Sequence, residues 1–287
     1  MILVTGATGT VGSEVARLLA AGGERVRALT RNPAKAPAMA GVEMVRGDFD
    51  DPESLAYAAA KAEALFLLDA PGPEVPRHDQ AMLAAARTAG VRKVVKISAI
   101  GTGERDGAEV GDWHLPGEQA LRSTGTPDGW VWTVLRPSSF ASNALGWIEP
   151  IRSGAPIPNT TGNGTQGVID PRDVAEVAVR ALTSDDHAGE VLTLTGPELL
   201  SVPDQAARLG EVLGRPLETV DVPLETYREG LLAAGLHPAF AEVAVSGSRL
   251  AAAGGNARLT GDVERVLGRP ARSFTVWARD HRSAFAS

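Results

Sequence analysis

The residues best placed for chemistry form a glycine-rich turn at the start of this 287-residue chain. An apolar strand leads into Gly6–Gly12 (GATGTVG), and an amphipathic helix over Val11–Ala21 follows. In this context Gly6 allows a tight turn, Gly9 lets backbone N–H groups approach a pyrophosphate, and Gly12 lets the helix pack closely on the strand. The helix N-terminus adds partial positive charge toward the phosphates. The pattern predicts a binding site for a dinucleotide cofactor.

The end of the second expected strand bears on which dinucleotide binds. A fold that selects NAD usually has Asp or Glu there, to hydrogen-bond the ribose 2′-hydroxyl. This chain has Arg31 instead, followed by Lys35, and both could hold a 2′-phosphate. NADP(H) is therefore favoured, with NAD(H) as the alternative if Arg31 is only a solvated cation. Asp48 and Phe49, after the third strand, would contact the adenine amine and cover its ring, unless they are a turn carboxylate and a core aromatic.

The composition narrows the class of protein. With 28 Lys and Arg against 35 Asp and Glu the net charge is −7, and there is no basic stripe, so no nucleic-acid partner is expected. The chain has no Cys, which excludes disulfides and thiolate chemistry and fits a reducing compartment. Met1 leads directly into the first strand, and no apolar run is long enough to cross a bilayer. We expect a cytoplasmic protein with no membrane partner, and the sequence is compatible with a homodimer.

Strand and helix patterns alternate through the first half of the chain, which predicts an α/β fold with a doubly wound, parallel, Rossmann-like sheet. The apolar runs Ala64–Leu68 and Lys93–Ile97 should be its central strands. A dinucleotide-binding domain is expected over residues 1–137, with late sheet elements from 168–195. Residues 138–167 and 196–287 should form a smaller, interleaved substrate lobe. The other expected strands are Val26–Thr30, Glu43–Arg46, Val131–Leu135 and Val191–Leu194, and the other expected helices are Pro52–Ala60, Pro76–Ala89, Pro116–Ser123, Asp170–Leu182, Leu199–Leu213 and Leu224–Leu250.

Several motifs together resemble one known group. They are the Gly6–Gly12 turn, Thr30–Pro33, Gly47–Phe49, Lys96–Ser98, Trp132–Pro137, Phe140, Asn143 and the helix start Asp173–Ala175. In combination they resemble the NmrA-like, atypical short-chain dehydrogenase/reductase group, whose closest enzymatic branch is similar to bacterial NADPH:quinone oxidoreductases. The resemblance covers roughly the first two-thirds of the chain well and the remainder weakly. It implies a Rossmann-like domain, a nicotinamide cofactor and a small C-terminal lobe.

The catalytic pair of the wider superfamily is absent from its usual place. Ordinary members use Tyr-x-x-x-Lys, in which the Lys helps to lower the pKa of the Tyr. Tyr57 and Lys61 have this spacing but precede Ser98, the expected third catalytic residue, so we interpret them as a decoy. Where the pair should follow, the chain has His114 and Glu118. His114 could donate a proton near neutral pH with Glu118 orienting it, or the two are a surface His and a solvated Glu.

Other candidate residues are placed by the expected strand ends. Ser98 could hydrogen-bond the substrate oxygen or cap its strand, and Asp69 and Ala70 would border the nicotinamide unless they form a plain turn. Asp173 is expected to be structural, at a helix start. The predicted cofactor contacts are Gly6, Thr8, Gly9, Thr10, Val11, Gly12, Arg31, Lys35, Asp48, Phe49, Asp69, Ala70 and Ser98. The predicted substrate contacts are Trp113, Phe140, Asn143 and Trp147, with core packing as the alternative, and no metal ligand is predicted.

The expected function is that of an NAD(P)H-dependent reductase that transfers hydride to a quinone or a related aromatic carbonyl compound. The anion formed from such an acceptor is delocalised, so a strong acid on the protein is less necessary. Tailoring of an aromatic polyketide is one setting for this activity. The alternative is an NmrA-like redox sensor that binds the dinucleotide without turnover and regulates a partner. A nucleotide-sugar epimerase ranks lowest, because it would need the missing Tyr–Lys pair.

Overall fold

The computed structural model describes residues 1–104, 112–123 and 129–286, and these divide into two units. The first unit takes in the described residues up to 104, those between 112 and 136, and 174–192. The second takes in 137–173 and 193–286. From the sequence we expected the chain to pass between the two units at residues 137, 168 and 195. The largest difference lies at 168, because the second unit continues to Asp173.

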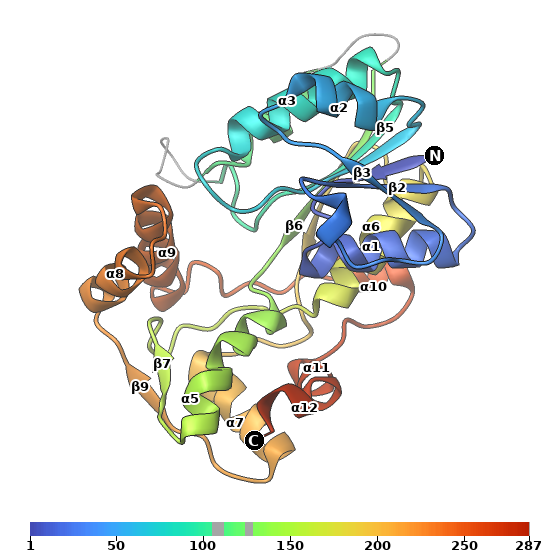
Figure 1. Cartoon of the computed structure of the whole chain (residues 1–287). Coiled ribbons are helices and arrows are strands. Elements are labelled where there is room, and N and C mark those ends of the chain that lie inside the picture. The colour runs from blue at the N-terminus through green and yellow to red at the C-terminus, as the bar shows by residue number, and fades with distance from the viewer. Residues whose placement is uncertain (105–111, 124–128, 287) are drawn as a thin grey trace. The chain divides into compact units, whose positions relative to one another are not determined.

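A seven-stranded sheet forms the framework of the first unit (Figure 1). In spatial order its strands are β3 (Val42–Arg46), β2 (Val26–Thr30), β1 (Ile2–Val4), β4 (Ala64–Leu67), β5 (Lys93–Ile97), β6 (Val131–Pro137) and β8 (Glu190–Leu194). The pairings from β3 through β6 are parallel. The two apolar runs expected to be central strands, Ala64–Leu68 and Lys93–Ile97, form the interior strands β4 and β5, which confirms that prediction.

Helices cover both faces of this sheet, so the doubly wound α/β fold is confirmed. α2 (Pro52–Ala59), α3 (Val75–Thr88) and α4 (Leu115–Arg122) lie on one face, and α1 (Thr10–Ala21) and α6 (Pro171–Thr183) lie on the other (Figure 1). The cluster beneath the first three helices includes Leu3, Leu55, Leu65, Met82 and Leu121, each fully buried. Burial of apolar area contributes about 25 cal/mol per Å². This packing fixes the carboxyl ends of the strands, where the site is built.

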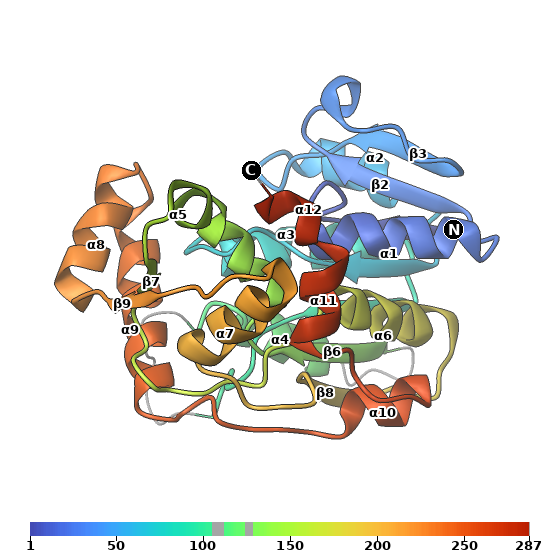
Figure 2. The same ribbon diagram turned by 90° about the horizontal axis from the view of Figure 1, so that it is seen from below.

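The second unit has an apolar core of its own. Its elements include η2 (Ala141–Trp147), α5 (Ile148–Ser153), α7 (Val202–Leu213), α10 (Asp262–Leu267), α11 (Phe274–Asp280), α12 (Arg282–Phe285) and a parallel pair, β7 (Ile157–Asn159) with β9 (Thr219–Asp221). In Figure 2, α7, α11 and α12 lie side by side. Trp277 is buried at their centre, and its ring stacks on those of Phe274 and His281.

The sequence prediction of one helical stretch over Leu224–Leu250 is wrong in one respect. The structure has two helices there, α8 (Leu224–Ala233) and α9 (Pro238–Ala252). Gly235 has φ of +79°, a conformation that ends helices, and Pro238 has no N–H to donate to a preceding turn. The two breakers lie only a few residues apart, and together they separate the helices.

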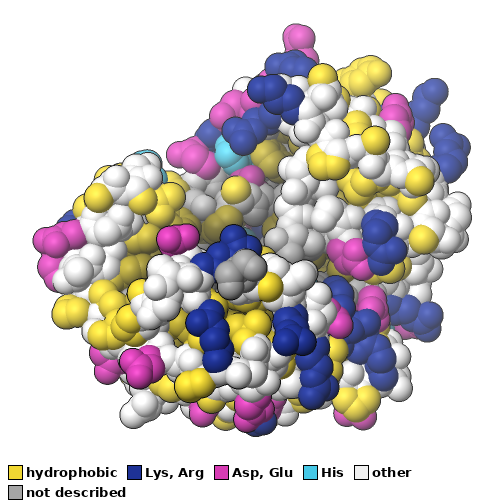
Figure 3. Space-filling view, turned by 60° about the horizontal axis from the view of Figure 1, so that its bottom comes forward, with side chains coloured by type: hydrophobic (Ala, Val, Ile, Leu, Met, Phe, Trp, Pro, Cys, Tyr) yellow, Lys and Arg dark blue, Asp and Glu magenta, His cyan; other side chains and the backbone are white. Residues whose placement is uncertain are grey.

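The described helices include none that is both long and apolar enough to span a membrane. On the face shown in Figure 3, Lys and Arg side chains are interspersed with Asp and Glu.

Candidate active site

The glycine-rich turn lies between β1 and α1. Thr5 holds it against β4, because its hydroxyl donates to the Leu68 carbonyl and accepts from the Leu68 N–H, both at 2.8 Å. Gly6 has φ of +61°, a conformation that favours glycine. A Cβ on Gly12 would overlap the Gly6 carbonyl oxygen, whereas a Cβ on Gly9 would meet no neighbour closer than 3.4 Å. Gly12 is therefore needed for packing, whereas a Cβ on Gly9 would make only an ordinary van der Waals contact at the start of α1.

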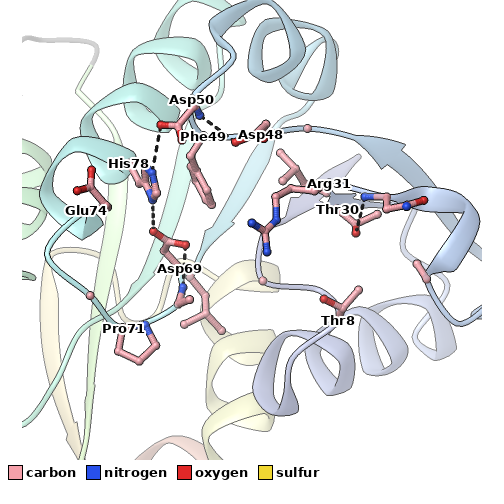
Figure 4. Close-up of a pocket in the computed structure, with 18 of the residues that line it drawn as sticks. Thr8, Thr30, Arg31, Asp48, Phe49, Asp50, Asp69, Pro71, Glu74 and His78 are labelled. Carbon is pink, nitrogen blue, oxygen red and sulfur yellow. Dashed lines mark hydrogen bonds and ion pairs between the residues drawn. The ribbon is translucent and has the colours of Figure 1, made fainter. Parts of the chain in front are cut away.

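A cavity of about 640 Å³ opens at the carboxyl ends of β1, β2, β3 and β4 (Figure 4). Ligands of open α/β sheets bind at this edge, where the strand order reverses beside the first strand. The volume is in the range of small-molecule and cofactor sites. The cavity is lined by Gly6, Thr8, Leu29, Thr30, Arg31, Asn32, Lys35, Ala36, Pro37, Gly47, Asp48, Phe49, Asp50, Leu68, Asp69, Ala70, Pro71, Gly72, Glu74 and His78, all of the first unit.

The wall that follows β2 carries two cations. Arg31 directs its guanidinium into the cavity (Figure 4), and Lys35 lies in the short helix η1 (Pro33–Lys35). Neither side chain has a carboxylate partner in the part of the chain that the structure describes. Unpaired cations of these types are strong donors to phosphate oxygens.

The wall formed after β3 and β4 carries carboxylates joined by a histidine (Figure 4). The Asp69 carboxylate accepts from the Ala70 N–H at 2.7 Å and lies 2.5 Å from Nδ1 of His78. Asp50 lies 3.4 Å from Nε2 of the same ring. The ring stacks on Phe49 with centroids 4.9 Å apart. His78 thus links the ends of two strands to α3.

Most of the predicted cofactor contacts line this cavity, and the residues present fit a dinucleotide. The ones that line it are Gly6, Thr8, Arg31, Lys35, Asp48, Phe49, Asp69 and Ala70, and the ones that do not are Gly9, Thr10, Val11, Gly12 and Ser98. Val11 and Gly12 are buried in the packing of α1. Asp48 also accepts from the Asp50 N–H at 3.1 Å, and Phe49 also packs against the apolar core, so the structural alternatives for both residues hold as well.

The sequence reasoning missed the residues that α3 and the loop before it contribute, chiefly Glu74 and His78, and it missed Asp50. One signal was available. Positions 74 and 78 are four apart, which places both on one face of the helix that follows Asp69. A helix that starts after a strand presents its first turn to the strand end, so such a pair belongs to the candidate site.

Ser98 and Glu118 form a buried network of their own. The Ser98 hydroxyl donates to Glu118 at 2.6 Å, and Arg136 donates to both oxygens of that carboxylate at 2.9 and 2.7 Å. Arg122 adds a bond of 2.7 Å. No hydrogen bond joins the Glu118 side chain to His114 within the described residues, so the prediction that Glu118 orients His114 is wrong. The Ser98 hydroxyl also lies 3.2 Å from the Thr102 hydroxyl, and its contact with a substrate stays a prediction.

His114 differs from its predicted role as a proton donor near neutral pH. It is the N-cap of α4, and its Nδ1 is buried with no hydrogen-bond partner among the described residues. Burial, and to a lesser extent the charge of Lys96, lowers the pKa of His114 to about 3. Lys96 is itself buried and lies 2.6 Å from Asp79, whose pKa is raised by burial. Gly117 makes room for this pair, because a Cβ there would overlap the Asp79 carboxylate. His114 is therefore a neutral imidazole near neutral pH.

The predicted substrate contacts are divided between the units. Trp113 is half-buried just before α4 in the first unit. Phe140, Asn143 and Trp147 lie at or within η2 in the second unit. Asn143 donates to the Ser139 hydroxyl at 3.3 Å, and Trp147 packs against the second core, as the core-packing alternative expects. Their contact with a substrate stays a prediction.

The Tyr-x-x-x-Lys spacing lies away from this site. Tyr57 is on α2 with 66% of its surface exposed, and neither it nor Lys61 lines the cavity. This placement agrees with the interpretation of the pair as a decoy.

A parallel sheet with a glycine-rich first turn and a cavity at the strand ends defines a Rossmann-like dinucleotide-binding protein. The chain belongs to the NAD(P)H-binding family, which its sequence matches over residues 6–185.

Two named reductases are similar to this chain over its whole length. The (4-alkanoyl-5-oxo-2,5-dihydrofuran-3-yl)methyl phosphate reductase of Streptomyces griseus is 39% identical over 288 residues, which cover 100% of this chain and 99% of that protein. The NAD(P)H azoreductase of Xenophilus azovorans is 34% identical over 289 residues, which cover 100% of both. The chain is thus an enzyme, an NAD(P)H-dependent oxidoreductase.

Solved structures confirm the fold. The NADPH-dependent quinone oxidoreductase of Escherichia coli superposes with a TM-score of 0.82 at 24% identity, covering 100% of both chains. The triphenylmethane reductase of Citrobacter sp., solved with NADP(H), has a TM-score of 0.81 at 26% identity and covers 99% of this chain and 100% of its own. The expected resemblance to quinone oxidoreductases is confirmed at the level of the fold.

Proposed function

We propose that this enzyme uses NADPH to reduce a conjugated, electron-poor acceptor, and that the acceptor is a quinone or a related aromatic carbonyl compound. The proposal rests on the bonding and protonation of the two residues at the expected catalytic position, His114 and Glu118. Glu118 is bonded to Ser98 and two arginines, and His114 is a neutral imidazole whose Nδ1 is buried. The Glu118 carboxylate is thus taken up by its own partners, and His114 is not an effective acid near neutral pH. A substrate that needs strong protonation in the transition state does not match this site.

A conjugated acceptor removes that need. The bound nicotinamide supplies a hydride, and the negative charge that arrives with it spreads over a quinone ring, so that water can protonate the product. The protein then has to orient the two reactants and keep the dinucleotide in place. The neutral His114 ring is able to donate a hydrogen bond to a developing oxyanion without giving up its proton.

The names of the relatives agree with this class of acceptor. A 5-oxo-2,5-dihydrofuran with a 4-alkanoyl group has a double bond conjugated with two carbonyls, and an azo compound has a conjugated N=N bond. Each of them places the added charge on a delocalised system. Aromatic polyketides with quinone rings belong to the same chemical class, which is why we retain polyketide tailoring as a setting for the reaction.

A panel of acceptors tests the proposal through NADPH oxidation, followed by the absorbance of the nicotinamide. It contains a benzoquinone, a naphthoquinone, a hydroxylated anthraquinone, an azo dye and an isolated cyclic ketone. Turnover of quinones together with failure of the ketone is expected. Comparable reduction of the ketone would show that the enzyme supplies a strong proton donor, which would contradict the proposal.

The preference for NADPH rests on Arg31 and Lys35. Loss of a charge-assisted hydrogen bond costs about 1.5–3 kcal/mol, so Arg31→Ala should raise the KM for NADPH about tenfold or more. The KM for NADH should stay nearly unchanged, because NADH has no 2′-phosphate. Arg46→Ala is the matched control, since Arg46 pairs with Asp51 at 3.2 Å and does not line the cavity. Equal loss with both cofactors would contradict the role of Arg31 in selection.

A further inference from the structure

A segment near the end of the second unit carries an excess of positive charge. Between residues 265 and 282 it has five arginines and one acidic residue, Asp280, whereas the whole chain has a net charge of −7. The Asp280 carboxylate lies 2.7 Å from Arg172, far earlier in the chain. Asp280 is thus bound outside the segment, and the five arginines need acidic partners from elsewhere.

Three of the five arginines have such partners, and two do not. Those that bond to Asp262 or to the buried Asp173 are Arg265, Arg269 and Arg272. Arg279 and Arg282 form no ion pair with any carboxylate of the described residues. Guanidinium groups are strong hydrogen-bond donors to carboxylate and phosphate oxygens. Arg279 and Arg282 are therefore available to an external anion.

These two arginines line one cavity of about 380 Å³ in the second unit. Its other lining residues are Glu211 and Val212, in the last turn of α7, and Thr275 of α11. Within the part of the chain that the structure describes, no ion pair joins Glu211 to either arginine. The cavity thus has two guanidinium groups and a carboxylate that do not pair with one another. Its volume is in the range of small-molecule sites.

A buried aromatic core supports the walls of this cavity. Thr275 and Arg279 are four residues apart on α11, so they lie on one face of that helix. Trp277, two residues from each, lies on the opposite face, where it is buried and its ring stacks on that of His281. Both α11 and α12 pack against α7 (Figure 2). A site on elements supported in this way loses little conformational freedom on binding.

We propose that this cavity binds a small phosphorylated alcohol, whose phosphate is held by Arg279 and Arg282 and whose hydroxyl groups bond to Glu211 and Thr275. Guanidinium groups match the geometry of phosphate oxygens. The negative charge of Glu211 opposes a bare anion in the same cavity, but its carboxylate accepts hydrogen bonds from hydroxyl groups. The arrangement therefore selects an anion that also carries hydroxyl donors. The site shares no lining residue with the cofactor cavity, so it is independent of the proposed reduction.

Calorimetric titration of the whole protein with glycerol 3-phosphate and with sulfate, at constant ionic strength, tests this proposal. At about pH 7.5 both probes carry close to two negative charges, and only glycerol 3-phosphate has hydroxyl groups. We expect a Kd of about 1 mM for glycerol 3-phosphate. The Kd for sulfate should be about fivefold higher, the equivalent of one hydrogen bond. Absence of binding of both probes at about 10 mM, or equal Kd values for the two, would overturn the proposal.

Variants of the lining residues test their separate roles. Arg279→Gln combined with Arg282→Gln should raise the Kd for glycerol 3-phosphate at least about tenfold. Its unfolding temperature should match that of the wild type, because neither arginine has an ion pair to lose among the described residues. Glu211→Gln removes the opposing charge, so sulfate should bind about threefold more tightly. An unchanged Kd for glycerol 3-phosphate in the double variant would overturn the proposal.

Two controls identify the cavity in which the probe binds. Arg208 is also on α7, but it pairs with Glu198 at 3.3 Å and does not line this cavity, so Arg208→Gln should keep the wild-type Kd. Arg31→Ala removes a cation from the cofactor cavity and should also bind glycerol 3-phosphate as the wild type does. Loss of binding in Arg31→Ala would mean that the probe binds in the cofactor cavity, which would overturn the proposal.

Discussion

At the scale of single residues, the glycines of the phosphate turn have separable roles. Gly9 is the N-cap of α1 with an extended backbone that any residue adopts, and a Cβ there would lie 3.4 Å from the Gly6 carbonyl oxygen, an ordinary van der Waals distance. Gly12 has no such freedom, because a Cβ would overlap the Gly6 carbonyl oxygen. The same amino acid thus serves ligand access at one position and chain packing at the other.

Substitution at these two positions should separate cofactor binding from folding. We expect Gly9→Val to keep the thermal stability of the wild type and to weaken NADPH binding at least tenfold, because a branched side chain would occupy the pyrophosphate position. Gly12→Ala should instead lower the free energy of unfolding by about 2 kcal/mol, as for an overpacked core. Thermal unfolding and NADPH titration of both variants measure the two effects. Unchanged NADPH affinity in Gly9→Val would remove Gly9 from the cofactor site.

A second prediction at the scale of single residues follows from the pKa of His114. Because that pKa is about 3, the protonation of His114 does not change between about pH 5.5 and about pH 8. The kcat of His114→Gln should follow the wild-type pH profile in shape and lie about fivefold below it, the value of one ordinary hydrogen bond of about 1 kcal/mol. Stopped-flow reduction of a naphthoquinone across this pH range provides the measurement. An acidic limb that disappears in the variant would mean that His114 titrates during catalysis.

At the scale of elements, a buried carboxylate ties the start of α6 to the segment before α11. Asp173 is fully buried and accepts from Arg269 at 2.8 Å, from the Arg272 N–H at 2.6 Å, and from the Arg272 side chain. From the sequence we expected a structural role for Asp173, in which its carboxylate interacts with the dipole of its own helix. The structure adds that its partners come from a segment about a hundred residues further along the chain.

Asp173→Asn should therefore destabilise the second unit. Removal of one partner from a buried ion pair leaves the other charges unmatched, and for these partly exposed arginines we expect a loss of about 3 kcal/mol in the free energy of unfolding. Urea unfolding followed by tryptophan fluorescence measures it, since Trp277 lies in that core. Glu198→Gln breaks a more exposed pair with Arg208 and should cost less than about 1 kcal/mol. Similar losses in the two variants would contradict the assignment.

At the scale of the whole molecule, the half-buried His114 makes stability depend on pH. Its pKa is about 3 in the folded chain against an ordinary value of 6.5. Above that ordinary value both states are neutral at this residue, so it contributes no pH dependence. As the pH falls below it, the unfolded chain binds a proton that the folded chain does not, and the free energy of unfolding decreases.

Comparison with His114→Asn isolates this contribution, because Asn is also a favourable N-cap residue. Between about pH 7.5 and about pH 5.5 the wild type should lose about 1 kcal/mol more stability than the variant, since each unit of pKa shift corresponds to about 1.4 kcal/mol. Urea unfolding at the two pH values provides the measurement. Equal losses in both proteins would mean that His114 is protonated in the folded state.

The sequence by itself determined the fold class, the class of cofactor and eight of the residues that line the cofactor cavity. These features depend on local patterns: an apolar strand, a glycine-rich turn and a helix in succession, and polar residues directly after strands such as Arg31 and Asp69. In a parallel sheet every strand ends at the same edge, so the order of residues along the chain already places those strand-end groups together. The absence of the Tyr–Lys pair could also be recognised from the sequence, because the usual position of that pair is defined relative to Ser98.

Only the tertiary structure decided how the polar side chains pair. Glu118 is four residues from His114 in sequence, yet its carboxylate bonds to Ser98 at the end of β5 and to Arg136 at the end of β6. His78 pairs with Asp69 across a turn, and burial next to Lys96 sets the charge of His114. Hydrogen-bond partners and pKa values depend on distance and desolvation, which arise from contacts between elements far apart in the chain. Helical spacing alone does not specify those contacts.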